Sequence, residues 1–296
     1  MTALELLDIR DVGREAWLNA RKQGIGASDC AAALGLNKYK TPYQLWAEKT
    51  GIAAPVAENE AMRWGNLLEP VIASEFGDRT GLILRKNDKL FVSNAYPWLM
   101  GTPDYFTNES GVPGGVQIKN TGAYLAHDWE GGIPDAVHCQ VEHEMAVTGF
   151  TFTYVVALVG GNKLVWHRIE RDEAIIHALI GKLEAFWELV KTKTPPPLSS
   201  GDSDTMTALY PESSPRHVVL PNGCDGLCRE YLDAKRHEKT ATERVDYFAA
   251  RLKAEMADAE LATAGRFQAT WKTQTRASYV VKATSFRKFT VKEAKN

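Results

Sequence analysis

The segments GTPD (residues 101–104) and GVQIK (residues 115–119) decide the expected fold and the expected site. The first closes an apolar run, and the second follows a turn rich in glycine and proline and is typical of a strand. Side chains two residues apart on a strand point to the same face, so Gln117 and Lys119 are expected side by side. Asp104, at the end of the neighbouring strand, is expected beside them.

The chemistry of this group indicates a metal-dependent site. A carboxylate, an oxygen-bearing side chain and a lysine at one place can hold Mg²⁺ and activate a water for phosphodiester hydrolysis. Gln117 is the anomaly, because its amide keeps a ligand oxygen but lacks the negative charge of the carboxylate expected there. Taken singly, Asp104 is typical of a turn and Lys119 of a surface position, so only their conjunction indicates a site.

Composition places the chain among ordinary globular proteins. Its 296 residues are 44% hydrophobic and 24% charged, with a net charge of −2. Four scattered cysteines fit a reduced cytosolic protein, and their spacing argues against an iron–sulfur cluster or a zinc site. The chain start lacks the features of a signal peptide, and no apolar run is long enough to span a membrane, so a cytoplasmic protein is expected.

Periodicity and capping signals predict the order of elements. Helices are expected over residues 14–21, 28–34, 41–50, 59–80, 134–149 and 172–190. Strands are expected near residues 82–84, 90–92, 98–101, 115–119, 152–159 and 164–169. This alternation implies an α/β core with a mixed sheet flanked by helices.

The C-terminal third differs in composition from the rest. We expect a core over residues 1–194, a proline-rich linker over 195–222 and a helical arm with a basic tail over 223–296. The arm is predicted as a helical hairpin or one long helix. Its apolar stripe consists of Leu227, Tyr231, Val245, Phe248, Leu252, Met256 and Leu261. The alternating residues after 267 fit strands or an extended tail, and the basic tail fits an anionic partner or plain solvation.

Other candidate residues lie outside the two opening segments. Ser28 is expected to cap a helix whose free N–H groups form a phosphate pocket, with Arg21 closing on the same anion. The alternative is a plain serine cap beside a surface arginine. Glu69, on the long helix before Pro70, gains a role if Asp104 is a metal ligand in need of a second carboxylate. Gln140, one helical turn from Glu144, orients a water or a phosphate, or simply lies on a polar face.

The order of motifs resembles one family over roughly the first two-thirds of the chain. The matching segments are RKQGIGASD (21–29), AAALGL (31–36), YQLWAEKTG (43–51), WGNLLEP (64–70), GTPD (101–104), QIK (117–119), IP (133–134), QVEHEM (140–145) and TG (148–149). They resemble the phage lambda-type exonucleases, grouped as YqaJ-like viral recombinases within the PD-(D/E)XK restriction-endonuclease-like fold. The region after the linker resembles the helical and basic tail of longer members more loosely.

The resemblance implies roles for the candidate residues. The positions implied to surround divalent Mg²⁺, or Mn²⁺ as a substitute, are Glu69, Asp104, Gln117 and the backbone carbonyl of Ile118. Lys119 is implied to position or activate the attacking water, with Gln140 supporting the site. Arg21 and Ser28 are implied to hold the 5′-terminal phosphate.

The implied function is a Mg²⁺-dependent 5′-to-3′ exonuclease on linear double-stranded DNA that releases mononucleotides in phage-type homologous recombination. A ring-shaped homotrimer and a single-strand annealing recombinase as partner are implied with it, in a bacterial host cell. Gln117 departs from the family's glutamate and leaves three interpretations open: an engineered inactivation, a natural variant with weaker metal affinity, or a DNA-end-binding clamp without catalysis. A structural phage protein is a further alternative, in which Asp104 and Lys119 are dispensable.

Overall fold

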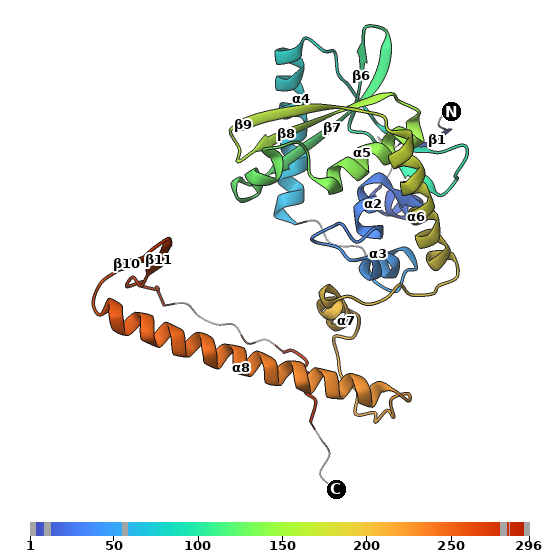
Figure 1. The fold of residues 1–296 in the computed structure, drawn as a ribbon. Helices are drawn as coiled ribbons and strands as arrows, with labels where there is room; N and C mark the ends of the chain where they lie inside the picture. Colours follow the sequence, from blue (N-terminus) through green and yellow to red (C-terminus); the bar gives the residue numbers. More distant parts are fainter. Residues whose placement is uncertain (1–3, 9–12, 55–58, 279–282, 284, 293–296) are drawn as a thin grey trace. The chain divides into compact units, whose positions relative to one another are not determined.

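The computed structural model describes residues 4–8, 13–54, 59–278, 283 and 285–292. The chain divides into two compact units, Met1–Leu209 and Tyr210–Asn296 (Figure 1). Within the described residues, no helix is long and apolar enough to cross a membrane.

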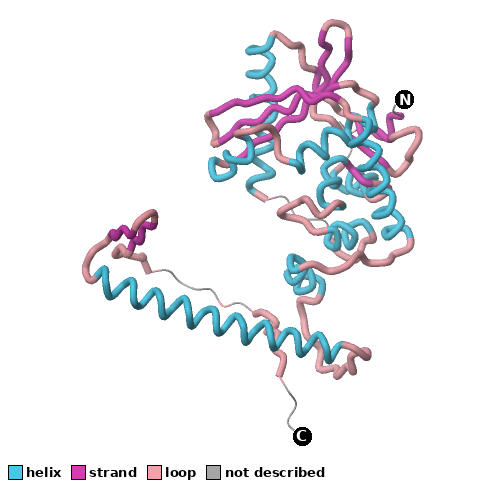
Figure 2. Tube along the Cα trace, in the orientation of Figure 1, coloured by secondary structure: helices cyan, strands magenta, loops and turns pink. Residues whose placement is uncertain are grey.

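The first unit combines helices with two sheets, as the cyan and magenta segments of Figure 2 show. Its helices are α1 (Arg14–Arg21), α2 (Ala27–Ala33), α3 (Pro42–Lys49), α4 (Glu60–Thr80), α5 (Asp135–Thr148), α6 (Glu173–Lys191) and α7 (Ser203–Leu209), with 3₁₀ helices η1 (Ala123–Trp129) and η2 (Ser200–Asp202). Its strands are β1 (Leu4–Asp8), β2 (Ile25–Gly26), β3 (Arg85–Lys86), β4 (Lys89–Val92), β5 (Leu99–Gly101), β6 (Tyr105–Glu109), β7 (Val112–Thr121), β8 (Phe152–Val159) and β9 (Lys163–Glu170).

The larger sheet has five strands in the order β3-β6-β7-β8-β9. Strands β7 and β8 run parallel, whereas the other neighbours are antiparallel, so the sheet is mixed as the sequence predicts. Helix α4 packs on one face, where Phe76 contacts the cluster that contains Val116 and Ile118. Helix α5 packs on the other face, where Val141 lies in a cluster with Val155. Alternation along β7 therefore directs Gln117 and Lys119, which alternate with Val116 and Ile118, toward α5.

The smaller sheet has the order β1-β4-β5-β2, with β2 parallel to β5. Beside it, α2, α3 and α6 form an apolar cluster around Ile25, Leu45 and Leu183. The entry into β2 is tight, because the Ile25 N–H donates to the Trp98 carbonyl at 2.7 Å. A Cβ on Gly24 would lie 2.3 Å from that same oxygen, so only glycine fits there.

The predicted α/β fold with helices on both faces of a mixed sheet is confirmed, but three details differ. The predicted strand over 82–84 is absent from the described residues there, and the short strand begins at Arg85 instead. Strand β6 was not predicted at all. The apolar line along α4 is buried only at its C-terminal half, since the sheet covers Ile72 and Phe76 while Leu67 and Val71 stay 52% and 61% exposed.

The region from residue 195 onward contains more structure than a linker. It includes η2 and α7, and the Thr41 hydroxyl donates to the Asp202 carboxylate. The Ser199 N–H also donates to Asp202, at 2.7 Å. The first unit accordingly extends through Leu209.

The second unit contains one long helix, α8 (Cys224–Met256), followed by a hairpin of β10 (Leu261–Ala264) and β11 (Phe267–Thr270). Of the two predicted forms, the structure has the single helix. The helix ends at Met256, because Ala257 has a φ of 50° and breaks the helical path, so Leu261 of the expected stripe lies in β10 instead. Residues 279–282, 284 and 293–296 of the expected basic tail lie outside the described residues.

Candidate active site

The β6–β7 hairpin brings Asp104 beside Gln117. Strand β6 starts directly after Asp104, and its first residue, Tyr105, faces Val116 in the antiparallel register. One Asp104 carboxylate oxygen, Oδ2, accepts hydrogen bonds from the Gln117 Nε2 at 2.5 Å and the Ile118 N–H at 2.7 Å. The predicted neighbourhood of these residues is therefore present.

The reason for this neighbourhood differs from the prediction. The strand expected to carry Asp104, β5, belongs to the smaller sheet, and the unpredicted β6 pairs with β7 instead. Buried Asn87 fixes the segment before β6, because its side chain donates to the Pro103 carbonyl at 2.8 Å and its backbone N–H donates to the Asp104 carbonyl at 2.9 Å.

A chain of hydrogen bonds links β7 to α5. Lys119 Nζ donates to Gln140 Oε1 at 2.9 Å, and Gln140 Nε2 donates to Glu144 Oε1 at 3.0 Å. The two α5 residues are one turn apart and so lie on the same face of the helix. Gln140 is thus held in one orientation between a cation and a carboxyl group, and Lys119 is aimed at the α5 side of the sheet.

Helix α4 supplies a second carboxylate, Glu69. It pairs with Lys86 at 3.2 Å, and it hydrogen-bonds Tyr105, the residue after Asp104. Burial first and then the Glu69 charge raise the pKa of Tyr105 to about 12. The structure therefore brings Glu69, Asp104, Gln117, Ile118, Lys119 and Gln140 together, as the sequence predicts.

Electrostatics at this site favour added positive charge. Burial raises the pKa of Asp104 to about 6, the nearby Glu69 charge adds to the rise, and Lys119 with the Ile118 N–H opposes it. Burial also raises the pKa of Glu144, which is 1% exposed, to about 8, with the Asp104 charge as the next cause. A cation bound beside these carboxyl groups would lower their pKa values and stabilise their charged form.

The oxygen donors fit a hard divalent cation. Gln117 is 4% exposed, and no donor among the described residues hydrogen-bonds its Oε1. This oxygen, the Glu69 and Asp104 carboxylates and the Ile118 carbonyl are ligands of the type that Mg²⁺ accepts. No group of three His, Cys, Asp or Glu residues with metal-binding geometry occurs in the described part of the chain.

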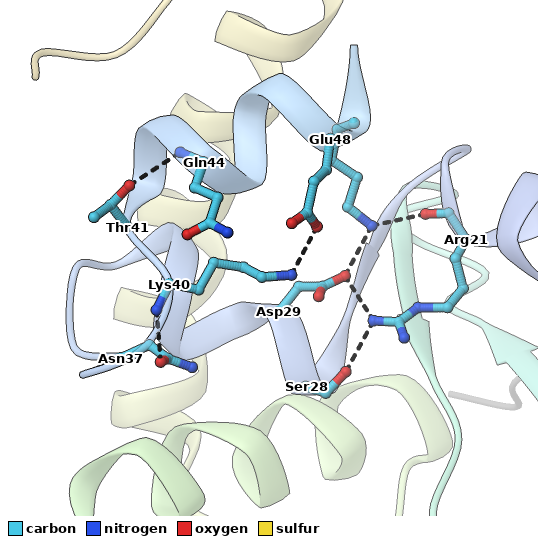
Figure 3. Close-up of polar contacts among 9 residues, drawn as sticks. Arg21, Ser28, Asp29, Asn37, Lys40, Thr41, Gln44 and Glu48 are labelled. Carbon is cyan, nitrogen blue, oxygen red and sulfur yellow. Dashed lines mark hydrogen bonds and ion pairs between the residues drawn. The ribbon is translucent and has the colours of Figure 1, made fainter. Parts of the chain in front are cut away.

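A second polar cluster lies where α1, α2 and α3 meet (Figure 3). Arg21 Nη2 donates to Ser28 Oγ and pairs with Asp29 Oδ2, both at 2.9 Å. Lys49 Nζ pairs with the same Asp29 oxygen at 2.8 Å and donates to the Arg21 carbonyl at 2.7 Å. Beside them, Lys40 pairs with Glu48 at 2.7 Å. Arg21 and Ser28 are thus in direct contact, as the sequence predicts.

The predicted cap is wrong, however. The N-cap of α2 is Gly26, so Ser28 lies inside the first turn and its hydroxyl accepts from Arg21 instead of capping the helix. A Cβ on Gly26 would lie 3.3 Å from the Arg21 guanidinium, so a small residue belongs there.

Asp29 and Lys49 were not among the predicted site residues. Asp29 is 6% exposed; burial alone would raise its pKa, but Arg21 and Lys49 hold it well below the usual range. The sequence signal for Asp29 is that it is the one acid in an otherwise small and apolar helix. A carboxylate buried there requires a cationic partner.

Helix α5 connects the two clusters. Its Gln140 and Glu144 face Lys119, whereas His143 Nε2 hydrogen-bonds the Met100 carbonyl of β5 at 2.8 Å. Full burial lowers the pKa of His143 to about 4, so the ring is neutral at pH 7. The four cysteines are free thiols.

Comparisons with known proteins point to one family and fold. A model of the YqaJ-like viral recombinase domain matches residues 16–151. The protein YqaJ of Bacillus subtilis (strain 168), described as uncharacterized, is 33% identical over 272 residues, which cover 88% of this chain and 84% of YqaJ. Protein D345L of African swine fever virus (strain Badajoz 1971 Vero-adapted) is 40% identical over 118 residues, 39% of this chain and 31% of D345L.

A solved structure has the same fold. The alkaline exonuclease LHK-Exo from Laribacter hongkongensis matches with a TM-score of 0.52 at 23% sequence identity. The match covers 60% of this chain and 93% of that enzyme.

Proposed function

Because this chain belongs to the YqaJ-like viral recombinase family, we propose that it is a metal-dependent exonuclease of phage-type homologous recombination. It degrades linear double-stranded DNA from 5′ to 3′ and releases mononucleotides. The observation that supports this most is the convergence of Asp104, Gln117 and Lys119 around the β6–β7 hairpin, with Gln140 behind them. The fold of LHK-Exo, an alkaline exonuclease, is consistent with the same chemistry.

The proposed metal ligands are Glu69, Asp104, the Gln117 side-chain oxygen and the Ile118 carbonyl. Mg²⁺, or Mn²⁺ in its place, supplies charge that polarises a phosphodiester and lowers the pKa of a bound water. Asp104 is the central ligand, since it already joins the strand β7 backbone to the Gln117 amide. Gln117 contributes a neutral oxygen, which weakens the site relative to a carboxylate.

Lys119 has the role of holding the attacking water. Its ammonium group donates to Gln140, which in turn is fixed by Glu144. A lysine held by one acceptor still has two N–H groups for a water and a phosphate oxygen. Gln140 is thus a positioning residue that keeps the Lys119 ammonium on the substrate side of the sheet.

Arg21 and Ser28 bind the 5′-terminal phosphate. The two cations Arg21 and Lys49 outnumber the single carboxylate of Asp29, so the cluster keeps a net positive charge for an anion. Arg21 already donates to Ser28, which presents the guanidinium and the hydroxyl to the same point.

The proposed assembly is a homotrimeric ring around DNA with a single-strand annealing recombinase as partner, in the cytoplasm of a bacterial host. A ring explains how a chain with a net charge of −2 binds DNA, because basic groups need only line the channel. The second candidate function is a DNA-end clamp without cleavage. Gln117 favours it, since this residue removes one negative charge from the metal site.

Digestion of linear duplex DNA tests the proposal. Substrates labelled at the 5′ or the 3′ end are incubated with Mg²⁺ and the chain as given, its Gln117→Glu variant or the Asp104→Ala control. Release of 5′-labelled mononucleotides by the Gln117→Glu variant and not by Asp104→Ala supports the exonuclease. End binding without cleavage by every form supports the clamp and removes the catalytic roles.

A further inference from the structure

Helix α8 carries a line of residues spaced alternately by four and three positions. The line consists of Leu227, Tyr231, Ala234, Glu238, Ala241, Val245, Phe248 and Leu252. This mean spacing of 3.5 residues is the heptad pattern of a coiled coil, with Glu238 as the one charged core position. We call these eight residues the α8 seam.

The α8 seam is exposed within its own unit. Leu227, Val245 and Leu252 are 70%, 66% and 55% exposed, although they are large and apolar. Tyr231 is 37% exposed and has a ring contact with Phe289. By contrast, Met256 at the end of the helix is 6% exposed. A helix of 33 residues, roughly 50 Å long, therefore presents an apolar edge that the described residues leave largely exposed.

We propose that two copies of this chain associate through α8 in an antiparallel coiled coil. In that geometry each core residue faces one residue of the second copy, and the pairing is symmetric about a two-fold axis. One register pairs the whole seam. It places Leu227 opposite Leu252, Tyr231 opposite Phe248, Ala234 opposite Val245 and Glu238 opposite Ala241 of the second copy.

This register is self-complementary in size and charge. It pairs the small residue Ala234 with a branched one and the two aromatic residues with each other. It also places Glu238 against an alanine, and Lys235 of the same helix already neutralises this carboxylate. A parallel, in-register pair would instead bring Glu238 against Glu238 of the second copy, which like-charge repulsion disfavours.

The residues that flank the seam select the same register. Glu230 and Arg251 lie on the same side of the seam, and the antiparallel pairing brings Glu230 of each copy to Arg251 of the other. Within the described part of the chain, neither residue has an ion-pair partner of its own. A parallel pair would direct Glu230 toward Lys235, which is already paired, and leave Arg251 without an acid. Two inter-copy ion pairs therefore result from the antiparallel arrangement alone.

The oligomeric state of the full chain tests this association. Sedimentation velocity compares the chain as given with a Val245→Asp, Phe248→Asp double variant, which places charges in the seam. We expect the particle formed by the variant to have half the mass of the particle formed by the parent. This ratio does not depend on any further association through the first unit. The control Ala250→Asp adds a charge to the exposed outer face of the same helix and is expected to keep the parent mass, with circular dichroism equal for all forms.

A charge exchange tests the register. Glu230→Arg and Arg251→Glu are each expected to weaken the association by on the order of tenfold, since each breaks both inter-copy pairs. The double variant Glu230→Arg, Arg251→Glu is expected to restore it. Equal masses for the parent and the seam variant would overturn the proposal and leave another protein as the occupant of the α8 seam. Failure of the double exchange to restore association would overturn the antiparallel register. Neither result depends on nuclease activity.

Discussion

Asp29 and Asp104 belong to the same unit, yet their pKa values move in opposite directions. Burial acts on both, but at Asp29 two neighbouring cations, Arg21 and Lys49, prevail and the pKa falls well below its usual range. At Asp104 burial prevails, because Lys119 and one backbone N–H offset it only in part, and the pKa rises to about 6. One cluster therefore carries enough cations to keep its carboxylate charged, whereas the other has too little positive charge to offset burial and fits a metal ion.

Removing Asp29 is expected to have the largest effect. The Lys49 side chain is 6% exposed and loses its carboxylate in Asp29→Ala, which leaves an unpaired buried cation. We expect the free energy of unfolding to fall by about 3–5 kcal/mol, measured by urea denaturation. As a control, Asp128→Ala breaks the surface pair with Lys38, and little or no change in the free energy of unfolding is expected. Equal losses in both variants would contradict a built-in buried ion pair.

His143 is expected to lower the stability of the first unit in acid, whereas Asp104 and Glu144, whose pKa values are raised, act in the opposite direction as the pH falls. The pKa of His143 is about 4 in the folded protein and about 6.5 when unfolded, so the unfolded state binds a proton first as the pH falls. The contribution of His143 to stability is complete above pH 6.5 and declines as the pH falls toward 4. Between pH 7 and pH 5 the expected loss is about 2 kcal/mol.

Unfolding curves at several pH values measure this effect. The groups that act electrostatically on the ring are Asp29 of α2, whose pKa lies well below this range, and Lys49 of α3, whose pKa burial lowers. The variant His143→Gln removes the titrating group, so its stability is expected to depend less on pH between 7 and 5. If the stability of this variant depended on pH as steeply as that of the parent, groups other than His143 would cause the acid sensitivity.

These predictions also show what the sequence reveals and what it does not. Period-two alternation places Gln117 and Lys119 on one face, and glycines with φ of 74° and 78° end α4 and α5 where the sequence predicts, at Gly81 and Gly149. The pairing of β6 with β7 was not predicted, because Tyr105–Glu109 mixes polar and apolar residues without a clear strand pattern. Local signals identify elements, whereas strand partners depend on contacts between distant parts of the chain.

The same limit applies to the candidate site. Residue types at Asp104 and Lys119 indicated the chemistry, but the ion pair between Asp29 and Lys49 joins residues from separate helices. Ser28 matched the pattern of an N-cap, yet the tight turn at Gly26 starts α2 two residues earlier. A cap pattern specifies the start of a helix only when no neighbouring side chain competes for the serine hydroxyl.

Converting Gln117 to glutamate sharpens the difference between the two clusters. In the metal-free protein, Gln117→Glu removes a 2.5 Å hydrogen bond to Asp104 and places a second carboxylate there. We expect stability to fall by about 1–2 kcal/mol without metal and to rise on addition of Mg²⁺ by more than in the parent chain. Thermal unfolding with and without Mg²⁺ measures both effects.

A matched control separates local charge from metal binding. Asn120→Asp adds the same negative charge on the same strand, three residues further along, at an exposed position. For this variant, Mg²⁺ is expected to raise the stability by no more than it does for the parent chain. A gain equal to that of Gln117→Glu would show that the ion responds to net charge and not to the Asp104 site.

The smallest expected effect is that of Ser28→Ala, and it tests the function of the Arg21 cluster rather than its stability. The hydroxyl only accepts one hydrogen bond from Arg21, and Asp29 continues to hold the guanidinium, so the free energy of unfolding changes by about 0.5–1 kcal/mol.

Binding of the DNA end is expected to change more than stability. In the proposed role Ser28 donates its free O–H to a terminal phosphate, so the preference for 5′-phosphorylated over 5′-hydroxyl duplex ends should fall by roughly tenfold or more, the equivalent of one hydrogen bond to a charged group. Fluorescence anisotropy with the two duplexes measures this preference in the presence of Ca²⁺, and the exposed Thr207→Ala variant, which also loses one hydroxyl on a helix, should leave it unchanged. An unchanged preference in Ser28→Ala would leave Ser28 as a structural acceptor for Arg21, and the net positive charge of the cluster would then have another use.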